Sequence, residues 1–181
     1  MVGTIEPRKN HGHLLDAFDI LWQNGVNVSL CFVGKVGWKC QALMKRVEMH
    51  RELKRHLFML EDLSDTELEY CYRKSRSLVF PASVEGFGLP LVEAMQRGLP
   101  VMASDIAVFR EVGGDYVAYF ALDRPETLME LILHYETSGR FPATKKLVDW
   151  SWLNWEDSAR QLFSKIVSHI SLNNSGEHAL K

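Results

Sequence analysis

Two carboxylates frame a glycine-rich stretch that runs from Glu85 to Glu93 with the sequence EGFGLPLVE, between an apolar run and a helical pattern. Glycine lets the backbone turn tightly and approach a ligand, and Pro90 suits the first turn of a helix. The free N–H groups and the dipole of such a helix start bind anions. Phosphate at the turn, with hydroxyls at the two acids, would describe a nucleotide-sugar. An ordinary strand-to-helix turn, with Glu93 only favouring the dipole, is equally compatible with these residues.

A pair of cations, Arg8 and Lys9, precedes a second helix start, for which Asn10 is the expected N-cap. The helix dipole disfavours cations at this position, and an anion lying between the two side chains would reverse that penalty. Taken alone, two solvated loop charges are the simpler interpretation. Two phosphate-binding elements at strand ends of one sheet would make the ligand interpretation stronger.

The elements that must position these residues are short strands alternating with helices. Strands are expected at 28–33, 56–60, 77–80, 100–103 and 116–120, and helices at 11–24, 38–54, 65–75, 89–97, 106–113 and 125–138. This alternation predicts an α/β fold with a Rossmann-like, doubly wound parallel sheet. Right-handed crossovers place the carboxyl ends of the strands at one edge, which is where such sheets bind ligands.

The two ends of the chain depart from this pattern. Residues 155–171 have the periodicity of a C-terminal amphipathic helix with Asn154 as its N-cap, and residues 172–181 form a polar tail. We therefore expect one domain over 1–171, followed by the tail. Residues 1–4 look like the last part of a strand, which suggests that an N-terminal portion of the fold is missing.

Composition excludes several classes of protein. The 181 residues are 46% hydrophobic and 24% charged, with a net charge of −2, which is typical of a globular protein and gives no electrostatic drive toward nucleic acid. The chain has neither an apolar run of membrane-spanning length nor a signal-peptide layout. Three cysteines without CxxC spacing indicate reduced thiols in a cytoplasmic protein. No set of Cys or His residues accompanies His11 and His13 to complete the ligands of a metal ion, so no metal site is expected.

The order of these motifs resembles the C-terminal, donor-binding domain of the family-4 glycosyltransferases, which have the two-domain GT-B fold. The resemblance covers nearly the whole chain and is carried by VGTIEPRKN, CFVGKVGW, LEDLSDTELEYCYRKS, PASVEGFGLPLVEAMQRGLPVMASDIAVFREV and SWLNWEDSARQL. EGFGLPLVE matches the E-x7-E element of that family. The surrounding sequence is most similar to bacterial mannosyltransferases that use GDP-mannose to build O-antigen or similar polysaccharides.

The resemblance implies a role for each matching residue. Lys9 neutralises the donor diphosphate with Arg8 beside it, and Glu85 lies near the donor sugar, so these three are the expected catalytic residues. Glu93 holds the ribose hydroxyls. The other expected donor-binding residues belong to the glycine turn, the helix start, the base site and the pocket wall: Gly3, Gly34, Leu60, Asp62, Leu63, Gly86, Phe87, Gly88, Leu89 and Pro90.

The same resemblance implies retaining transfer of a hexosyl group without a metal or another cofactor, and the sequence has no D-x-D triplet. The cations and the helix start would stabilise the departing diphosphate. Two positions depart from the family pattern. Thr4 stands where many relatives have a second arginine, and Asn10 replaces the usual glycine. Both departures occur in the mannosyltransferase-like branch.

Relatives of this kind carry an N-terminal domain that binds the acceptor. We expect that domain to be absent from this sequence, so that the donor pocket is open to water and the chain alone transfers little; a second chain that carries the domain is one alternative. The expected partners are a nucleotide-sugar, with GDP-mannose favoured, and a glycan or lipid-linked glycan acceptor. The surplus of basic residues at 35–55 is a solvated face, or else a contact with the inner face of an acidic membrane. An apolar patch left uncovered would favour a homo-dimer.

Two other classes of function stay open. A non-catalytic nucleotide-binding remnant, or one half of a split glycosyltransferase, would share the same pocket. A receiver-like or flavodoxin-like signalling domain has a similar size, but the first strand lacks a clustered acidic pair and the glycine-rich loop lies late in the chain.

Overall fold

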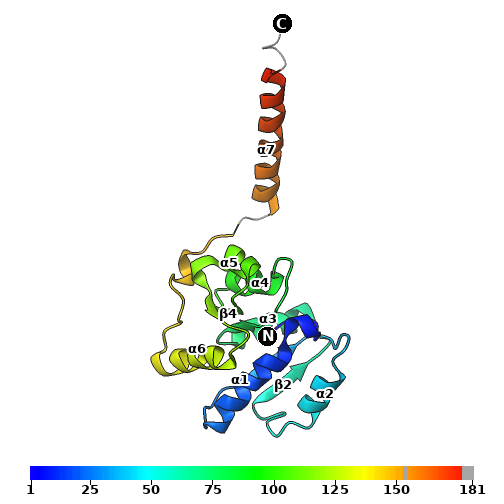
Figure 1. Cartoon of the computed structure of the whole chain (residues 1–181), viewed down its shortest axis with the longest axis vertical. Helices are drawn as coiled ribbons and strands as arrows, with labels where there is room; N and C mark the ends of the chain where they lie inside the picture. Colours follow the sequence, from blue (N-terminus) through cyan, green and yellow to red (C-terminus); the bar gives the residue numbers. More distant parts are fainter. Residues whose placement is uncertain (153–154, 177–181) are drawn as a thin grey trace. The chain divides into compact units, whose positions relative to one another are not determined.

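Parallel strands and helices alternate from Met1 to Trp150, as the sequence predicts (Figure 1). The computed structural model describes residues 1–152 and 155–176. The strands are β1 (Leu30–Val33), β2 (Leu57–Leu60), β3 (Leu78–Phe80), β4 (Val101–Ser104) and β5 (Ala118–Phe120). The helices of this unit are α1 (His11–Gln23), α2 (Gln41–Glu48), α3 (Asp65–Lys74), α4 (Leu89–Gln96), α5 (Ala107–Gly113) and α6 (Pro125–Ser138), with short 3₁₀ turns at Pro7–Lys9, Gly114–Tyr116 and Leu147–Asp149.

The strands form two hydrogen-bonded sets rather than one continuous sheet. One set pairs β1 with β2, the other has the order β3-β4-β5, and all pairs are parallel. The first residues of the chain run beside β1, with isolated parallel bridges from Val2 to Val33 and from Ile5 to Val36. Residues 1–5 therefore lie beside β1 in parallel, at the place where the sequence predicts a strand that leads into a turn.

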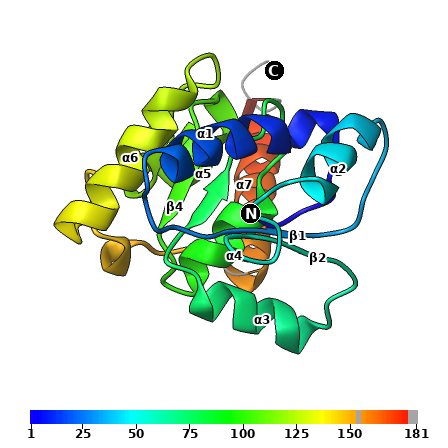
Figure 2. The same cartoon turned by 90° about the horizontal axis from the view of Figure 1, so that it is seen from below.

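Helices cover both faces of the strands, which is why most strand residues are apolar. Figure 2 shows α1 and α6 on one side and α3 on the other. Among the largest side chains that are fully buried are Phe32, Phe80, Phe109 and Phe120, each from a strand or from the helix packed beside it. A strand buried on both sides needs a continuous apolar run, and this requirement explains the short runs in the sequence.

Three local predictions were wrong, each for an identifiable reason. The helix expected at 38–54 extends only over Gln41–Glu48, because the chain then turns at Glu52, whose carbonyl accepts hydrogen bonds from the N–H groups of His56 and Leu57. The strand expected at 116–120 begins at Ala118, after a 3₁₀ turn. Asn10 has a left-handed backbone (φ 57°) and its side chain makes no capping hydrogen bond.

Residues 151–181 form a second unit, which is described here by itself. Its helix α7 extends over Trp155–Gly176, so the predicted amphipathic helix is present but continues into the residues expected to form a polar tail. Leu162, Phe163 and Ile166 of this helix are exposed. The predicted cap at Asn154 and residues 177–181 lie outside the described residues, and the predicted domain limits stay a prediction. Within 1–152 and 155–176, no helix is both long and apolar enough to cross a membrane.

Candidate functional site

The predicted site residues follow the carboxyl ends of neighbouring parallel strands. Gly3 follows the first bridge, Gly34 follows β1, and residues 60–63 end β2. The loop from Pro81 to Gly88 follows β3 and leads into α4. Ligands of open α/β sheets bind at this edge, because the loops after parallel strands gather there.

Lys9 and Glu85 form a buried ion pair, in which the Lys9 ammonium donates to Oε1 of Glu85. Lys9 is 7% exposed and the Glu85 side chain 10% exposed. Arg8 Nη1 lies 3.1 Å from the same carboxylate oxygen, and Arg8 Nη2 lies 2.6 Å from Oε1 of Glu6. The anion expected between Arg8 and Lys9 is, in this structure, the carboxylate of Glu85. The three predicted catalytic residues are therefore in contact.

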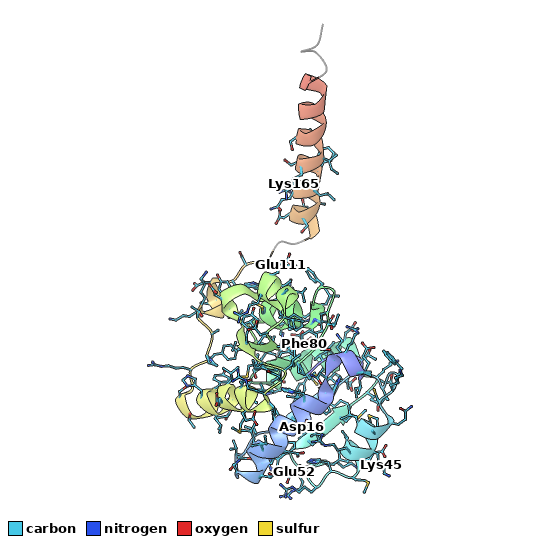
Figure 3. The ribbon with its side chains drawn as sticks, viewed as in Figure 1. Asp16, Lys45, Glu52, Phe80, Glu111 and Lys165 are labelled. Carbon is cyan, nitrogen blue, oxygen red and sulfur yellow. The ribbon has the colours of Figure 1, made fainter. Side chains whose placement is uncertain are left out.

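The aromatic ring of Phe80 supports the buried ammonium from the end of β3. The Lys9 Nζ atom lies 4.9 Å from the centroid of this ring, and Figure 3 labels Phe80 within the first unit. An ammonium over the face of an aromatic ring is attracted to the ring's electrons. The ring thus helps to hold Lys9 at a position where little water reaches it.

Ser83 joins the two loops and was missed by the sequence reasoning. Its amide donates to the carbonyl of Arg8 at 2.8 Å, and its hydroxyl donates to the same oxygen at 3.1 Å. Arg8 in turn donates from Nη1 to the Val84 carbonyl at 3.4 Å. A serine in a loop has no distinctive spacing, so nothing in the sequence alone could have assigned it this role.

The backbone at Gly3 and Gly34 must approach too closely for a side chain. Gly34 has φ 147°, and a Cβ on it would overlap the carbonyl of Gly3. A Cβ on Gly3 (φ 134°) would lie 3.8 Å from the Lys9 ammonium nitrogen. The two glycines therefore form a backbone wall beside Lys9, which agrees with their expected place at the edge of a ligand pocket.

The glycine turn before α4 has the predicted geometry. Gly88 is the N-cap with φ 87°, and a Cβ there would lie 2.8 Å from the Phe109 ring. Pro90 lies in the first turn, as expected. Leu89 is 59% exposed and Phe87 is 41% exposed at this edge. Space around Gly86 is open. The turn thus presents backbone and the positive end of a helix dipole toward the surface.

Glu93 is tied to α3 by a tyrosine that the sequence reasoning also missed. The hydroxyl of Tyr72 donates to Oε2 of Glu93 at 2.8 Å. Burial, and next the hydrogen bond to Glu93, raise the pKa of Tyr72 well above its usual range, so the hydroxyl keeps its proton. The guanidinium of Arg97 lies 4.8 Å from the centroid of the Tyr72 ring and donates to the Glu93 carbonyl at 2.8 Å. Glu93 is therefore held in one orientation.

The residues expected beside the base lie on an exposed turn. The Gly34 amide donates to the Leu60 carbonyl at 2.9 Å, which aligns the ends of β1 and β2. Asp62 has a left-handed backbone (φ 53°) and pairs with Lys35 at 2.9 Å. Leu63, next along the turn, is half-buried.

His11 lies buried at the start of α1, where its ring packs edge-on against Phe32 with centroids 5.1 Å apart. Burial first, and then the positive charges of the N-terminus and Lys9, lower the pKa of His11 to about 3. The ring is therefore neutral at pH 7. Over residues 1–152 and 155–176, no group of three His, Cys, Asp or Glu side chains is arranged to hold a metal ion.

The sequence and fold of the chain match those of known proteins. A family model described as "Glycosyl transferases group 1" matches residues 1–147. The chain is 38% identical over 166 residues to the serotype-specific mannosyltransferase WbdA of Escherichia coli, a match that covers 92% of this chain and 20% of that protein. The chain thus spans about a fifth of the length of that relative.

Two solved structures share the fold of the chain. The C-terminal domain of a glycosyl transferase group 1 family protein (LpcC) from Francisella tularensis gives a TM-score of 0.65 at 17% identity, covering 75% of this chain and 73% of that one. The structure of HepE from Anabaena, in complex with UDP and glucose, gives a TM-score of 0.64 at 21% identity. The match covers 82% of this chain and 41% of that one. At these identities the likeness concerns the fold, and it confirms the predicted Rossmann-like domain of GT-B type.

Proposed function

The chain belongs to the group 1 glycosyl transferases, and we propose that it supplies the donor site of a retaining mannosyltransferase that extends an O-antigen-type polysaccharide from GDP-mannose. The observation that carries this proposal is the contact of Lys9, Arg8 and Glu85 at the carboxyl edge of the strands. Arg8 and Lys9 follow residues 1–5, which run beside β1, whereas Glu85 lies in the loop after β3, which leads directly into α4.

In this proposal the donor diphosphate binds beside Lys9 and Arg8 and in front of the first turn of α4. An ammonium has three N–H donors, and Glu85 takes one of those of Lys9, so two can reach phosphate oxygens. The helix dipole adds positive potential at the same place. Negative charge grows on the diphosphate as it departs, and cations fixed in advance lower the free energy of that transition state.

The transfer itself is proposed to proceed on one face of the sugar. The bond between the anomeric carbon and the diphosphate oxygen breaks, and its electron pair leaves with the diphosphate. The acceptor hydroxyl oxygen bonds to the same face of that carbon, and its proton passes to the departing diphosphate. Glu85 would orient the sugar hydroxyls, and Glu93, held by Tyr72, would bind the ribose hydroxyls. No metal or other cofactor is part of this proposal.

The choice of mannose is supported by the name of the relative that matches 92% of the chain, a serotype-specific mannosyltransferase. We propose a glycan or lipid-linked glycan as the acceptor and a cytoplasmic site of action at the inner face of the membrane. A domain that binds the acceptor would complete the site, on the same or another chain. A donor-binding half of a split enzyme is the second candidate, favoured by the exposure of Leu89 and Val84 at the edge of the site.

Calorimetric titration with GDP, UDP, GDP-mannose and UDP-glucose tests the proposal. We expect saturable binding of the guanosine nucleotides, weakened about tenfold or more in Glu93→Gln, because one ribose hydrogen bond to a charged group contributes about 1.5–3 kcal/mol. Glu130→Gln, on the exposed side of α6, is the matched control and should bind like the parent chain. Preference for UDP would overturn the choice of base, and no binding of any of the four at millimolar concentration would overturn the donor site.

A further inference from the structure

Two carboxylates neutralise the two cations that the candidate site offers to an anion. Glu85 contacts both Lys9 and Arg8, whereas Glu6 contacts Arg8, with its Oε1 2.6 Å from Nη2. The Glu6 side chain is 11% exposed and that of Arg8 is 43% exposed. Glu6 is therefore a half-hidden anion beside the proposed diphosphate site, and the proposed reaction gives it no role.

A tryptophan holds the second oxygen of Glu6. The indole Nε1 of Trp38 donates to Oε2 of Glu6 at 3.0 Å. Trp38 lies in the loop between β1 and α2 and is 56% exposed, although its indole N–H is engaged. Glu6 thus gives one oxygen to Arg8 and the other to Trp38. It does not grip the guanidinium with both oxygens, as a carboxylate does in a bidentate arginine pair.

Hydrogen bonds between the two loops fix the backbone around Glu6 and Trp38. The Gly37 amide donates to the Ile5 carbonyl at 2.9 Å. The thiol sulfur of buried Cys40 lies 2.9 Å from the same carbonyl oxygen and 3.1 Å from the carbonyl oxygen of Trp38. A Cβ on Gly37 would lie only 2.8 Å from the Ile5 carbonyl oxygen. The place of the Glu6 carboxylate is therefore set by the fold and does not depend on its contact with the guanidinium alone.

A diphosphate that binds at this site must compete with the carboxylates for Arg8. Coulomb repulsion between two anions is several-fold stronger at the low effective dielectric constant of a partly buried site than in water. Glu85 is held by two cations, whereas one cation and a neutral indole hold Glu6. The contact between Arg8 and Glu6 is therefore the one that an arriving diphosphate can break at the lower cost.

We propose that Glu6 is a positioning residue that restrains Arg8 until a diphosphate displaces it, and that Trp38 weakens this restraint by occupying one oxygen of the carboxylate. Arg8 then turns Nη2 from Glu6 to a phosphate oxygen, while Trp38 keeps the carboxylate in place. The exposed side chain of Arg8 is free to make this movement, whereas the Lys9 side chain, which is 8% exposed, stays fixed. The inference rests on the proposed donor site, because it takes the anion beside Arg8 to be a diphosphate.

Calorimetric titration with inorganic pyrophosphate, which has neither base nor sugar, tests the inference. Glu6→Gln keeps the shape of the side chain and removes its charge, so the variant should bind pyrophosphate about tenfold more tightly than the parent chain. A merely structural role of Glu6 predicts the opposite, namely weaker binding together with a lower free energy of unfolding. Glu130→Gln, which removes an exposed carboxylate from α6, is the matched control and should bind like the parent chain.

Trp38→Phe should change the affinity in the opposite direction. Without the indole N–H, both oxygens of Glu6 can contact the guanidinium of Arg8, so pyrophosphate should bind about threefold more weakly. This effect requires the charge of Glu6. The double variant Glu6→Gln/Trp38→Phe should therefore bind like Glu6→Gln alone, whereas two unrelated structural effects would add.

The indole N–H resonance of Trp38 reports the displacement in the parent chain. Pyrophosphate should shift this resonance, because Arg8 leaves the carboxylate to which the indole donates. The resonance is assigned by its absence from the spectrum of Trp38→Phe. Trp22, whose Nε1 donates to the Val28 carbonyl at 2.8 Å, is the internal control and should not shift.

Equal or weaker binding of pyrophosphate by Glu6→Gln would overturn the inference, and so would an unshifted Trp38 resonance at saturating pyrophosphate. Absence of pyrophosphate binding in both chains would overturn it too. GDP, titrated into the same chains, separates this failure from failure of the proposed donor site. Binding of GDP would leave the donor site standing whatever pyrophosphate does, whereas no binding of either ligand would overturn both proposals.

Discussion

The buried pair of Lys9 and Glu85 makes a prediction that a double-mutant cycle can measure. Lys9→Met removes the ammonium but keeps an apolar side chain that fills most of its space, and Glu85→Gln removes the charge with almost no change of shape. Each single change leaves a charge at a position where less than about a tenth of the side chain is exposed. The double change removes both charges, so it should cost less than the sum of the two.

The size of the effect follows from the contacts. Two unit charges about 4 Å apart attract by about 4 kcal/mol at an effective dielectric constant of about 20. Removing one partner of a buried pair typically costs about 3–5 kcal/mol. Arg8 lies 3.1 Å from the same carboxylate, and with 43% of its side chain exposed it compensates in part. We therefore expect each single change to cost about 2–3 kcal/mol, with a coupling of about 2 kcal/mol between them.

Urea unfolding of the parent chain, the two single variants and the double variant gives the four free energies of the cycle. Lys145→Met is the control, because Lys145 pairs with Asp115 at 3.3 Å with more than half of both side chains exposed, and such surface pairs contribute about 1 kcal/mol or less. Additivity of the two single costs within about 0.5 kcal/mol would refute the reasoning, because it would mean that the two charges do not interact.

Three further outcomes are expected. Gly34→Ala should lower the free energy of unfolding, measured in urea, by about 3 kcal/mol or more, because its methyl group would overlap the carbonyl of Gly3 and the residue has a positive φ. Gly86→Ala, in open space, should cost less than about 1 kcal/mol. Equal costs would contradict the close approach of the backbone at Gly34 to Gly3. Tyr72→Phe should lower the free energy of unfolding by about 1–3 kcal/mol at pH 7. Because the pKa of Tyr72 is raised in the fold, the free energy of unfolding of the parent chain should fall faster than that of the variant above about pH 10, where the unfolded tyrosine ionises. Parallel curves of unfolding free energy against alkaline pH would contradict this. Because the pKa of His11 is lowered to about 3 in the fold, its stabilising contribution should be present above about pH 6.5 and should fall by about 1.4 kcal/mol per pH unit below that. His11→Gln should remove this dependence of the unfolding free energy on pH, and the control His134→Gln, at an exposed position, should not. An unchanged acid slope in His11→Gln would show that the ring is not held neutral.

Much of the fold could be predicted because its strands are buried on both faces. The apolar runs that end at Val33, Phe80 and Ala103 have no polar alternation, a pattern typical of strands covered by helices on both sides. The glycine turn at Gly88 could be predicted as well, since its positive φ and the proline that follows are local requirements. Such features depend on a few neighbouring residues, and periodicity and turn chemistry report them directly.

Contacts between distant residues could not be predicted in the same way. Tyr72 and Glu93 come from different helices, and Ser83 reaches Arg8 from a loop far along the chain. No spacing rule connects such positions, because they meet only after the strands have paired. The early end of α2 was missed for a related reason: the turn around Glu52 is fixed by backbone hydrogen bonds to β2 rather than by a glycine or proline.

The central claim is that Lys9 and Arg8 bind the diphosphate of a donor nucleotide, and calorimetric comparison of GDP with GMP tests it most directly. The two ligands share base and ribose, so the difference in their affinities reports the terminal phosphate. We predict that the parent chain and Lys145→Met bind GDP at least tenfold more tightly than GMP, because charge-assisted hydrogen bonds contribute about 1.5–3 kcal/mol each. Lys9→Met should lose this preference. Equal affinities for GDP and GMP in the parent chain, or a preference that Lys9→Met keeps in full, would contradict the claim.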